Sequence, residues 1–270
     1  MIRRTVPQKT ISKETKLSGV GLHTGEHVNI TFKPAPADTG LVFVREDIEG
    51  DNLINAHIKY ISNTDRGTNL DNGVFRIHTS EHVLAAITGL EIDNCFICLD
   101  GPEVPIMDGS SKYFISALEE AKIVEQNVLR EEFFPSEPIS YVCEDSGSKI
   151  SIIPDDNYKV NTIVDYKTKV LGEQEASINH ISEFKEEISS ARTFSFLHEL
   201  ETLLENGLIK GGDLNNAIVY VDKPLAESNM DILKKAFNKD SISVTPNGIL
   251  DNLDLHYPNE AARHKLLDVI

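Results

Sequence analysis

The chain has 270 residues, of which 40% are hydrophobic and 26% charged, a balance typical of a globular protein. Its 26 Lys and Arg against 43 Asp and Glu give a formal net charge of −17, which argues against broad nucleic-acid binding. No apolar run approaches the roughly 18 residues that span a bilayer, and no secretory signal follows the basic N-terminus. The three cysteines fit a reducing compartment, so we expect a cytoplasmic protein without a transmembrane segment.

The first half predicts short strands followed by helices. Val28, Ile30 and Phe32 alternate with polar residues, which indicates a half-buried strand. Hydrophobic runs, helical spacing and turn residues then predict further elements in chain order. These are a strand at 41–44, a loop or hairpin at 62–73, a helix at 80–88 that Gly89 closes, a strand at 95–99 and an amphipathic helix at 113–121.

The second half follows a charged segment with two prolines at 125–138, where we place a domain boundary. The elements predicted after it are strands at 149–153 and 159–166, a long helix at about 190–206, a turn and strand at 211–222, a short helix at 229–238, a loop at 245–260 and a final helix containing 263–268. Because strands precede helices in both halves, we expect an α+β fold of two similar layered domains, residues 1–130 and 131–270. The second domain has an insert at about 211–262.

Residues 78–82, His-Thr-Ser-Glu-His, form the first candidate site. Glu81 beside His82 at a helix start could supply a proton acceptor and a metal ligand together. Taken alone, the segment is more simply interpreted as a solvated helix N-terminus, where an acidic side chain complements the helix dipole.

His264 and Asp268 form the second candidate site. They are four residues apart, so a helix would place both side chains on one face, about 5–6 Å apart at Cβ. That separation suits two ligands of one ion, although a helical His–Asp ion pair is a common alternative.

Together, His82, His264 and Asp268 make a set of two imidazoles and one carboxylate. Three protein ligands with an open position are typical of a catalytic zinc site, and the set would also accept Fe²⁺. Glu81 would then be placed to take a proton from water. The spacing alone does not require that the two segments meet.

Other candidate motifs are weaker. Cys95 and Cys98 match C-x-x-C, but they belong to an apolar strand and are interpreted as buried core residues. The glycine-rich segment 19–25 has Thr24 where a dinucleotide loop needs glycine, so we expect a tight loop beside a site. The remaining histidines without a partner at ligand spacing are His27, His57, His180, His198 and His256.

Several of these segments resemble the UDP-3-O-acyl-N-acetylglucosamine deacetylases, in order and over nearly the whole chain. The matching segments are 19–45 (GVGLHTGEHVNITFKPAPADTGLVFVR), 78–94 (HTSEHVLAAITGLEIDN), 101–110 (GPEVPIMDGS), 189–196 (SSARTFSF), 207–219 (GLIKGGDLNNAIV) and 263–268 (RHKLLD). The resemblance implies zinc-dependent hydrolysis of the substrate's acetamide with release of acetate, the committed step of lipid A biosynthesis.

The resemblance also assigns roles to residues of this chain. It implies that His82, His264 and Asp268 hold zinc, that Glu81 is the general base and that Thr193 helps to hold the oxyanion. It implies that Lys265 contacts the substrate at its diphosphate. The other residues expected to bind substrate, mostly along the passage for the 3-O-acyl chain, are Phe194, Leu200, Gly212, Ala217, Leu22 and His23.

The resemblance implies a particular architecture and a fusion partner. In the family's fold, two α+β domains each carry a helix pair on a sheet and a small insert, and the helices are sandwiched between the sheets. The sequence stops at Ile270, before the family's general-acid His, so we expect this 270-residue form to have little or no activity. Some members are fused to a β-hydroxyacyl dehydratase downstream, so this end is explained either by such a covalent partner or by a shortened form of the chain.

Three alternatives remain open from the sequence. Another metal-dependent hydrolase, such as a peptidase, is disfavoured because the chain lacks H-E-x-x-H. A non-catalytic protein could use the acyl passage to hold lipid. A purely structural two-domain protein would leave the two candidate sites unexplained.

Overall fold

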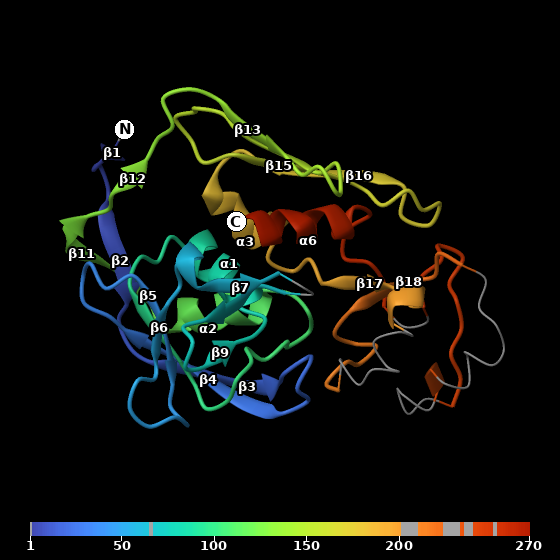
Figure 1. Ribbon diagram of the computed structural model, residues 1–270, viewed down its shortest axis with the longest axis horizontal. Coiled ribbons are helices and arrows are strands. Elements are labelled where there is room, and N and C mark those ends of the chain that lie inside the picture. Colours follow the sequence, from blue (N-terminus) through green and yellow to red (C-terminus); the bar gives the residue numbers. More distant parts are fainter. Residues whose placement is uncertain (1, 65–66, 201–209, 224–232, 235–239, 251–252) are drawn as a thin grey trace.

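The computed structural model describes residues 2–64, 67–200, 210–223, 233–234, 240–250 and 253–270 (Figure 1). Within these ranges the fold is mixed α/β, with several small sheets and few helices. The largest sheet has the strand order β3–β4–β10–β5–β6, and only its β10–β5 pair is parallel. Its strands are β3 (Thr15–Val20), β4 (His27–Pro34), β5 (Leu41–Arg45), β6 (Leu53–Asn55) and β10 (Cys95–Leu99).

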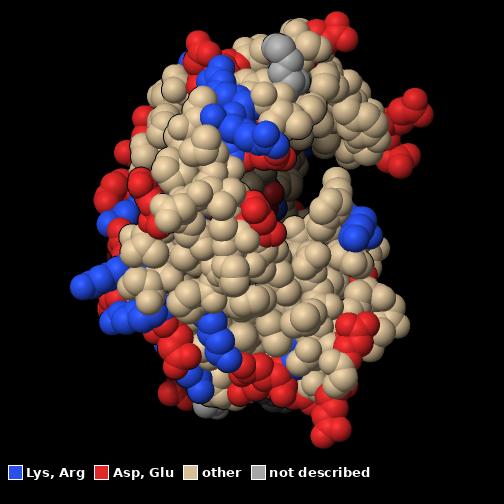
Figure 2. Space-filling view, turned by 90° about the vertical axis from the view of Figure 1, so that its left-hand side faces the viewer, with Lys and Arg blue, Asp and Glu red and all other residues tan. Residues whose placement is uncertain are grey.

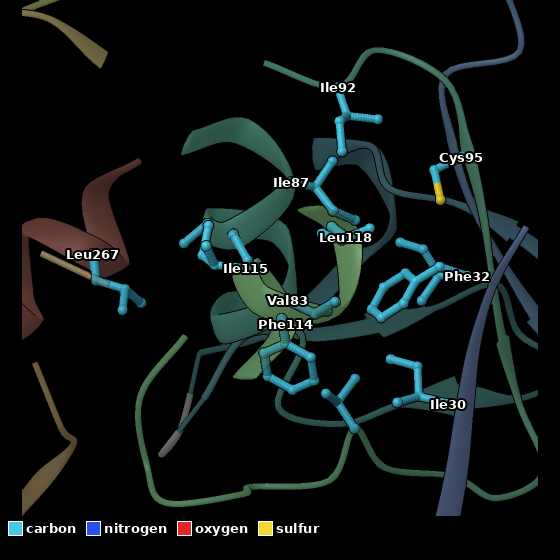
Figure 3. Close-up of a cluster of buried hydrophobic side chains, with 14 of the residues drawn as sticks. Ile30, Phe32, Val83, Ile87, Ile92, Cys95, Phe114, Ile115, Leu118 and Leu267 are labelled. Atoms are coloured by element: carbon cyan, nitrogen blue, oxygen red, sulfur yellow. The ribbon is translucent and has the colours of Figure 1, made fainter. Parts of the chain in front are cut away.

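Two helices cover one face of this sheet and form the core with it. The alternating Val28, Ile30 and Phe32 are all at most 1% exposed, which confirms the predicted half-buried strand. They face α1 (Glu81–Gly89) and α2 (Lys112–Glu120), both close to their predicted positions. Figure 3 shows side chains of β4, α1 and α2 gathered in one hydrophobic cluster.

The cysteines behave as the apolar strand predicts. Cys95 and Cys98 are both buried in β10, and the pKa of each thiol is raised by burial, to about 12 and about 11. Cys143 is partly exposed, and all three thiols are free.

A small antiparallel sheet lies beside the start of α1. Its order is β7–β8–β9, and it places a hairpin in the turn-rich region predicted at 62–73. Its strands are β7 (Ile61–Asn63), β8 (Asn69–Asp71) and β9 (Arg76–Ile77). The short 3-10 helix η1 (Ile58–Tyr60) precedes them.

The N-terminal strands pair with strands from the middle of the chain. Antiparallel pairs join β1 (Ile2–Arg3) to β12 (Glu132–Phe133) and β2 (Pro7–Ile11) to β11 (Ile123–Leu129). The segment where we expected the boundary therefore remains hydrogen-bonded to the N-terminal strands as far as residue 133.

The second half adds two antiparallel ribbons and a layer of helix. The ribbons are β13 (Ile139–Val142) with β14 (Lys149–Ile152), and β15 (Val160–Asp165) with β16 (Glu173–Ile178). Among its helices are η2 (Ile181–Glu183), α3 (Phe184–Glu187) and α6 (Glu260–Val269). In Figure 1, α6 lies between the β15–β16 ribbon and α1, and it contacts all three elements.

The two halves pack closely where α1 ends. Leu266 and Leu267 of α6 belong to the same core cluster as the side chains of α1. A Cβ atom at Gly89 would overlap the ring of Phe184, which is fully buried at the start of α3. Glycine is therefore required at the end of α1 by a close approach between the halves.

The predicted long helix at 190–206 is partly wrong. Residues 194–196 form β17 (Phe194–Phe196), which pairs in parallel with β18 (Ile218–Tyr220), and helical structure begins only at residue 197. At 194–196 the helix prediction failed because pairing with a distant strand overrides local preference, whereas Leu197 and Leu200 are helical as expected. Residues 201–206 lie outside the described residues, as does most of the predicted helix at 229–238, where 233 and 234 are helical.

The helices and the distribution of surface charge bear on the expectations drawn from composition. Among the residues described, no helix combines the length and the apolar character needed to cross a bilayer. Figure 2 shows acidic and basic side chains interspersed on one face around a largely uncharged centre.

Candidate active site

A cavity of about 480 Å³ opens between the start of α1, the face of α6 and the loop after β3. All of the predicted site residues except His82 line it. They are Leu22, His23, Glu81, Thr193, Phe194, Leu200, Gly212, Ala217, His264, Lys265 and Asp268. These residues come from five separate stretches of the chain, in both halves, and reach one cavity.

Glu81 opens α1 and points into this cavity. Its Oε2 accepts a hydrogen bond from the backbone N–H of Thr68 at 2.8 Å, and Ser80 Oγ donates to the Thr68 carbonyl at 2.8 Å. Burial raises the pKa of Glu81 to about 7, against an ordinary value of 4.5. A carboxyl group with that pKa can both accept and return a proton near neutral pH, which suits a general base.

His264 and Asp268 lie one turn apart on α6, as their spacing predicted. His264 Nε2 is 3.7 Å from Asp268 Oδ1. His264 Nδ1 lies 3.1 Å from the Ala191 carbonyl oxygen, which can only accept, so Nδ1 carries the hydrogen. Burial lowers the pKa of His264 to about 4, so the ring is neutral at pH 7 and its Nε2 presents a lone pair.

His82, at the start of α1, lies close to His264 of α6. The ring centroids of His82 and His264 are 5.2 Å apart, and His82 Nε2 is 3.8 Å from Glu81 Oε1. His82 is 3% exposed, burial lowers its pKa, and its buried Nδ1 has no hydrogen-bond partner among the described residues. The fold thus brings together two segments whose proximity the sequence could not establish.

The donor types of these three residues fit a zinc ion. Burial raises the pKa of Asp268, but His264 and Lys265 lower it below its ordinary value, so the group is a carboxylate at neutral pH. The lone pair of His264 Nε2 then faces a carboxylate oxygen at 3.7 Å with no proton between them. Two ligands of a tetrahedral zinc ion, each bound at roughly 2.0–2.1 Å, lie about 3.4 Å apart, which is close to this separation.

The three side chains approach one another pairwise rather than as a closed set. Among the residues described, no three His, Cys, Asp or Glu side chains are close enough together to count as a formed metal site. The chemistry of the donors, rather than a completed coordination shell, is therefore what indicates a metal.

Comparison with known proteins places the chain in a family. The family model described as UDP-3-O-acyl N-acetylglycosamine deacetylase (LpxC) matches residues 8–232. The chain belongs to this deacetylase family. The resemblance on which the sequence analysis relied is thereby confirmed.

The deacetylase family includes relatives of two lengths. A bifunctional enzyme LpxC/FabZ of Chlorobaculum tepidum is 43% identical over 268 residues, covering 98% of this chain and 57% of the relative. A protein of the same name from Porphyromonas gingivalis is 41% identical over 263 residues, covering 97% and 57%. A UDP-3-O-acyl-N-acetylglucosamine deacetylase of Acidithiobacillus ferrooxidans is 36% identical over 268 residues, covering 98% and 80%. The chain thus spans little more than half the length of the bifunctional relatives.

In this deacetylase family member, Lys265 is held at the cavity wall by two contacts. Its Nζ is 2.7 Å from Asp268 Oδ2 and lies 5.5 Å from the centroid of the Phe194 ring. Burial lowers the pKa of Lys265, but the charge of Asp268, its hydrogen bond to Lys265 and the nearby Tyr166 and Glu81 together raise the pKa above its ordinary value. The side chain therefore presents a positive charge to the cavity at neutral pH.

Thr193 is fixed by backbone hydrogen bonds on both sides. Its N–H donates to the Gly109 carbonyl at 2.7 Å, and its carbonyl accepts from the N–H of Ile218 at 2.8 Å. Phe194 packs edge-on against Tyr166, Phe196 and Tyr220. The apolar wall near Leu200 and Ala217 also includes Leu214 and Val219.

Sequence reasoning missed several residues of this deacetylase family member that shape the site. Thr68, which binds Glu81, lies in the turn-rich region at 62–73, but nothing in that composition identifies it. Glu260 is fully buried and accepts hydrogen bonds from Arg192 at its backbone N–H (3.1 Å), Nε (2.8 Å) and Nη2 (3.2 Å). The Arg192–Glu260 ion pair links the segment that contains Thr193 to the first turn of α6.

Proposed function

We propose that this chain hydrolyses the acetamide of UDP-3-O-acyl-N-acetylglucosamine with release of acetate, the committed step of lipid A biosynthesis. The observation that carries the proposal is the 5.2 Å separation of the His82 and His264 rings, with Glu81 and Asp268 beside them in one cavity. Family membership and relatives bearing the name of this deacetylase support the choice of substrate.

In this proposal, His82, His264 and Asp268 hold a zinc ion, and Fe²⁺ would fit the same donors. The metal, when bound, supplies Lewis-acid activation of water and of the amide carbonyl. The neutral imidazoles preserve the charge of the ion because burial keeps their pKa values low. The Ala191 carbonyl fixes the ring of His264 through Nδ1 and leaves Nε2 directed at the site.

Glu81 takes the proton from the attacking water in this mechanism. Its pKa of about 7 means that it is a carboxylate in a substantial fraction of molecules at neutral pH and can later return the proton. The Thr193 hydroxyl lies at the cavity wall, where it would donate to the carbonyl oxygen as negative charge develops.

The substrate would bind along two chemically different walls. The charge of Lys265 would meet the diphosphate, because an ammonium group binds phosphate oxygens strongly. Phe194, Leu200, Gly212 and Ala217 would line the path of the 3-O-acyl chain, and Leu22 with the ring of His23 would complete the rim.

The test is an assay of acetate release from UDP-3-O-acyl-N-acetylglucosamine by chelator-treated protein, with and without added Zn²⁺. We expect zinc-dependent release of acetate together with the free amine product, at the low rate anticipated for this 270-residue form. Folded, zinc-loaded protein that binds the substrate and releases no acetate would contradict the proposal and favour the lipid-holding alternative.

We also infer the two-domain architecture of the family, with domains near 1–130 and 131–270, an insert at about 211–262 and the helices sandwiched between sheets. The five-stranded sheet on one side of α1 and α2 and the β15–β16 ribbon on the other side of α6 support this arrangement.

A covalent β-hydroxyacyl dehydratase partner is supported by the bifunctional names of relatives. Mass spectrometry of the protein isolated from its source organism tests that partner, and the expected cytoplasmic location stays a prediction.

A further inference from the structure

Glu103 is a fully buried carboxylate to which the mechanism gives no role. Its oxygens accept hydrogen bonds from the backbone N–H of His23 (3.0 and 3.2 Å) and of Thr24 (2.9 Å). They also accept from the hydroxyls of Thr24 and Thr79, each at 2.9 Å. None of these four donors is a charged side chain, so the buried charge is stabilised by oriented dipoles that it holds in place.

These hydrogen bonds link two segments that reach the cavity. Residues 21–25 form the loop after β3, and Leu22 and His23 of this loop line the cavity. Thr79 has a left-handed backbone (φ 57°) and lies two residues before Glu81. Glu103 itself does not line the cavity, so it can affect bound substrate only through these neighbours.

The outer side of the same loop is held by the second half of the chain. The N–H of Gly211 donates to the Leu22 carbonyl at 3.0 Å, and the N–H of Lys210 donates to the His23 carbonyl at 3.4 Å. A Cβ atom at Gly211 would overlap the Gly21 carbonyl oxygen, so glycine permits this close approach. The loop is therefore clamped between Glu103 beneath it and residues 210–211 above it.

We propose that Glu103 is a positioning residue that holds the loop 21–25 across the cavity, so that Leu22 and His23 contact the sugar-nucleotide substrate. This inference rests on the proposed function for the identity of the substrate. The carboxylate acts on affinity more than on turnover, because it holds the rim of the cavity and leaves Glu81 anchored by Thr68.

Glu103→Gln is the sharpest single change because it keeps the shape of the side chain. It replaces one accepting oxygen by an NH₂ group, which would face N–H and O–H donors. The loop should detach from its support, while β10 and α1 remain packed. Glu46→Gln is the matched control, because Glu46 makes an exposed ion pair with Lys33 (2.6 Å) away from the cavity.

The experiment combines hydrogen exchange with steady-state kinetics on zinc-loaded protein. In Glu103→Gln, we expect the His23 and Thr24 amides to exchange at least about tenfold faster, with the Ile97 amide of β10 unchanged. We expect KM for the sugar nucleotide to rise about tenfold and kcat to change less than about twofold, with zinc content unchanged. Glu46→Gln should match the unmodified chain in all of these measurements.

An unchanged KM would overturn the proposal, as would unchanged exchange at His23 and Thr24. If Glu103→Gln does not fold, Thr24→Val decides the matter: it removes one hydroxyl donor to Glu103, along with a long 3.3 Å contact from the Glu26 N–H, and should give a smaller change of the same kind. If the unmodified chain releases no acetate, the proposed function fails, whereas exchange at His23 and Thr24 still decides whether Glu103 holds the loop.

Discussion

The helices α1 and α6 both rest on buried apolar side chains, but only α6, among the described residues, adds a buried ion pair to the support of its candidate ligands. Behind His82, the side chains of Val83, Ala86 and Ile87 are fully buried. The polar support of this turn includes a hydrogen bond from Ser111 Oγ to the His82 carbonyl at 2.7 Å.

On α6, the support is an ion pair and an imidazole hydrogen bond. Glu260 in the first turn binds Arg192, and His264 Nδ1 binds the carbonyl of Ala191, the residue before Arg192. Two neighbouring residues outside the helix thus fix both its start and the face that carries His264 and Asp268. The comparison teaches that one site can be assembled from a side that depends mainly on packing and a side that depends on packing and on a satisfied buried charge.

The largest expected effect treats the two sides alike. His82→Ala and His264→Ala should each remove one of three metal ligands, so both variants should lose zinc and acetate release should fall to background. Metal content by mass spectrometry and acetate release measure this. A variant that kept stoichiometric zinc would show that its histidine is not a ligand.

Glu81→Ala should separate metal binding from proton transfer on the α1 side. We expect zinc to be retained and kcat to fall by about 10²–10⁴, the usual contribution of a general base. The zinc content of the same preparation serves as the control. Full activity with zinc bound would disprove the role of Glu81 as the base.

Breaking the ion pair should expose the dependence of the α6 side on buried charge. Glu260→Ala leaves Arg192 buried without its carboxylate and should cost about 3–5 kcal/mol of unfolding free energy. Ser111→Ala on the α1 side should cost only about 1 kcal/mol. Glu187→Ala, which removes the more exposed partner of Arg263, is the control and should cost less than about 1 kcal/mol.

Urea unfolding measures these three free energies. If Glu260→Ala were no less stable than Glu187→Ala, the buried pair would not be what holds the start of α6.

The two sides should also respond to pH in opposite senses in the metal-free protein. The folded pKa of His264 is about 4, below its ordinary 6.5, so its contribution to stability is lost as pH falls from 6.5 towards 4. The folded pKa of Glu81 is about 7, above 4.5, so its contribution is lost as pH rises from 4.5 to 7. Each effect is at most about 3 kcal/mol.

Unfolding free energies at pH 5 and pH 7.5 test this opposition. His264→Gln should lessen the loss of stability at pH 5, and Glu81→Gln should lessen the loss at pH 7.5. If both variants changed the difference in unfolding free energy between pH 5 and pH 7.5 in the same direction, the prediction of opposite pH responses would be wrong.

The periodicity of apolar residues predicted correctly those helices and strands that bury one apolar face. The helix at 81–89 and the strand at 95–99 follow from apolar periodicity and from Gly89 at the helix end. The His264–Asp268 pair followed from helical spacing. The strand at 194–196 could not be predicted because its partner lies more than twenty residues away at 218–220.

The contacts that assemble the site were also beyond local pattern. The approach of His82 to His264, the Thr68 amide on Glu81 and the Arg192–Glu260 pair each depend on chain segments that pack only in the folded molecule. The resemblance to a known family anticipated the residues that line the cavity, but not these supports.

Gly89 gives the arrangement a vulnerability far from the chemistry. Because its hydrogen rests against the Phe184 ring, a single added methyl group would act as a wedge between the halves and increase the separation of the two imidazoles. Such a mutation would separate the candidate ligands although each of their side chains is intact. The close packing of Gly89 at the end of α1 therefore limits the separation of His82 and His264 at the start of the same helix.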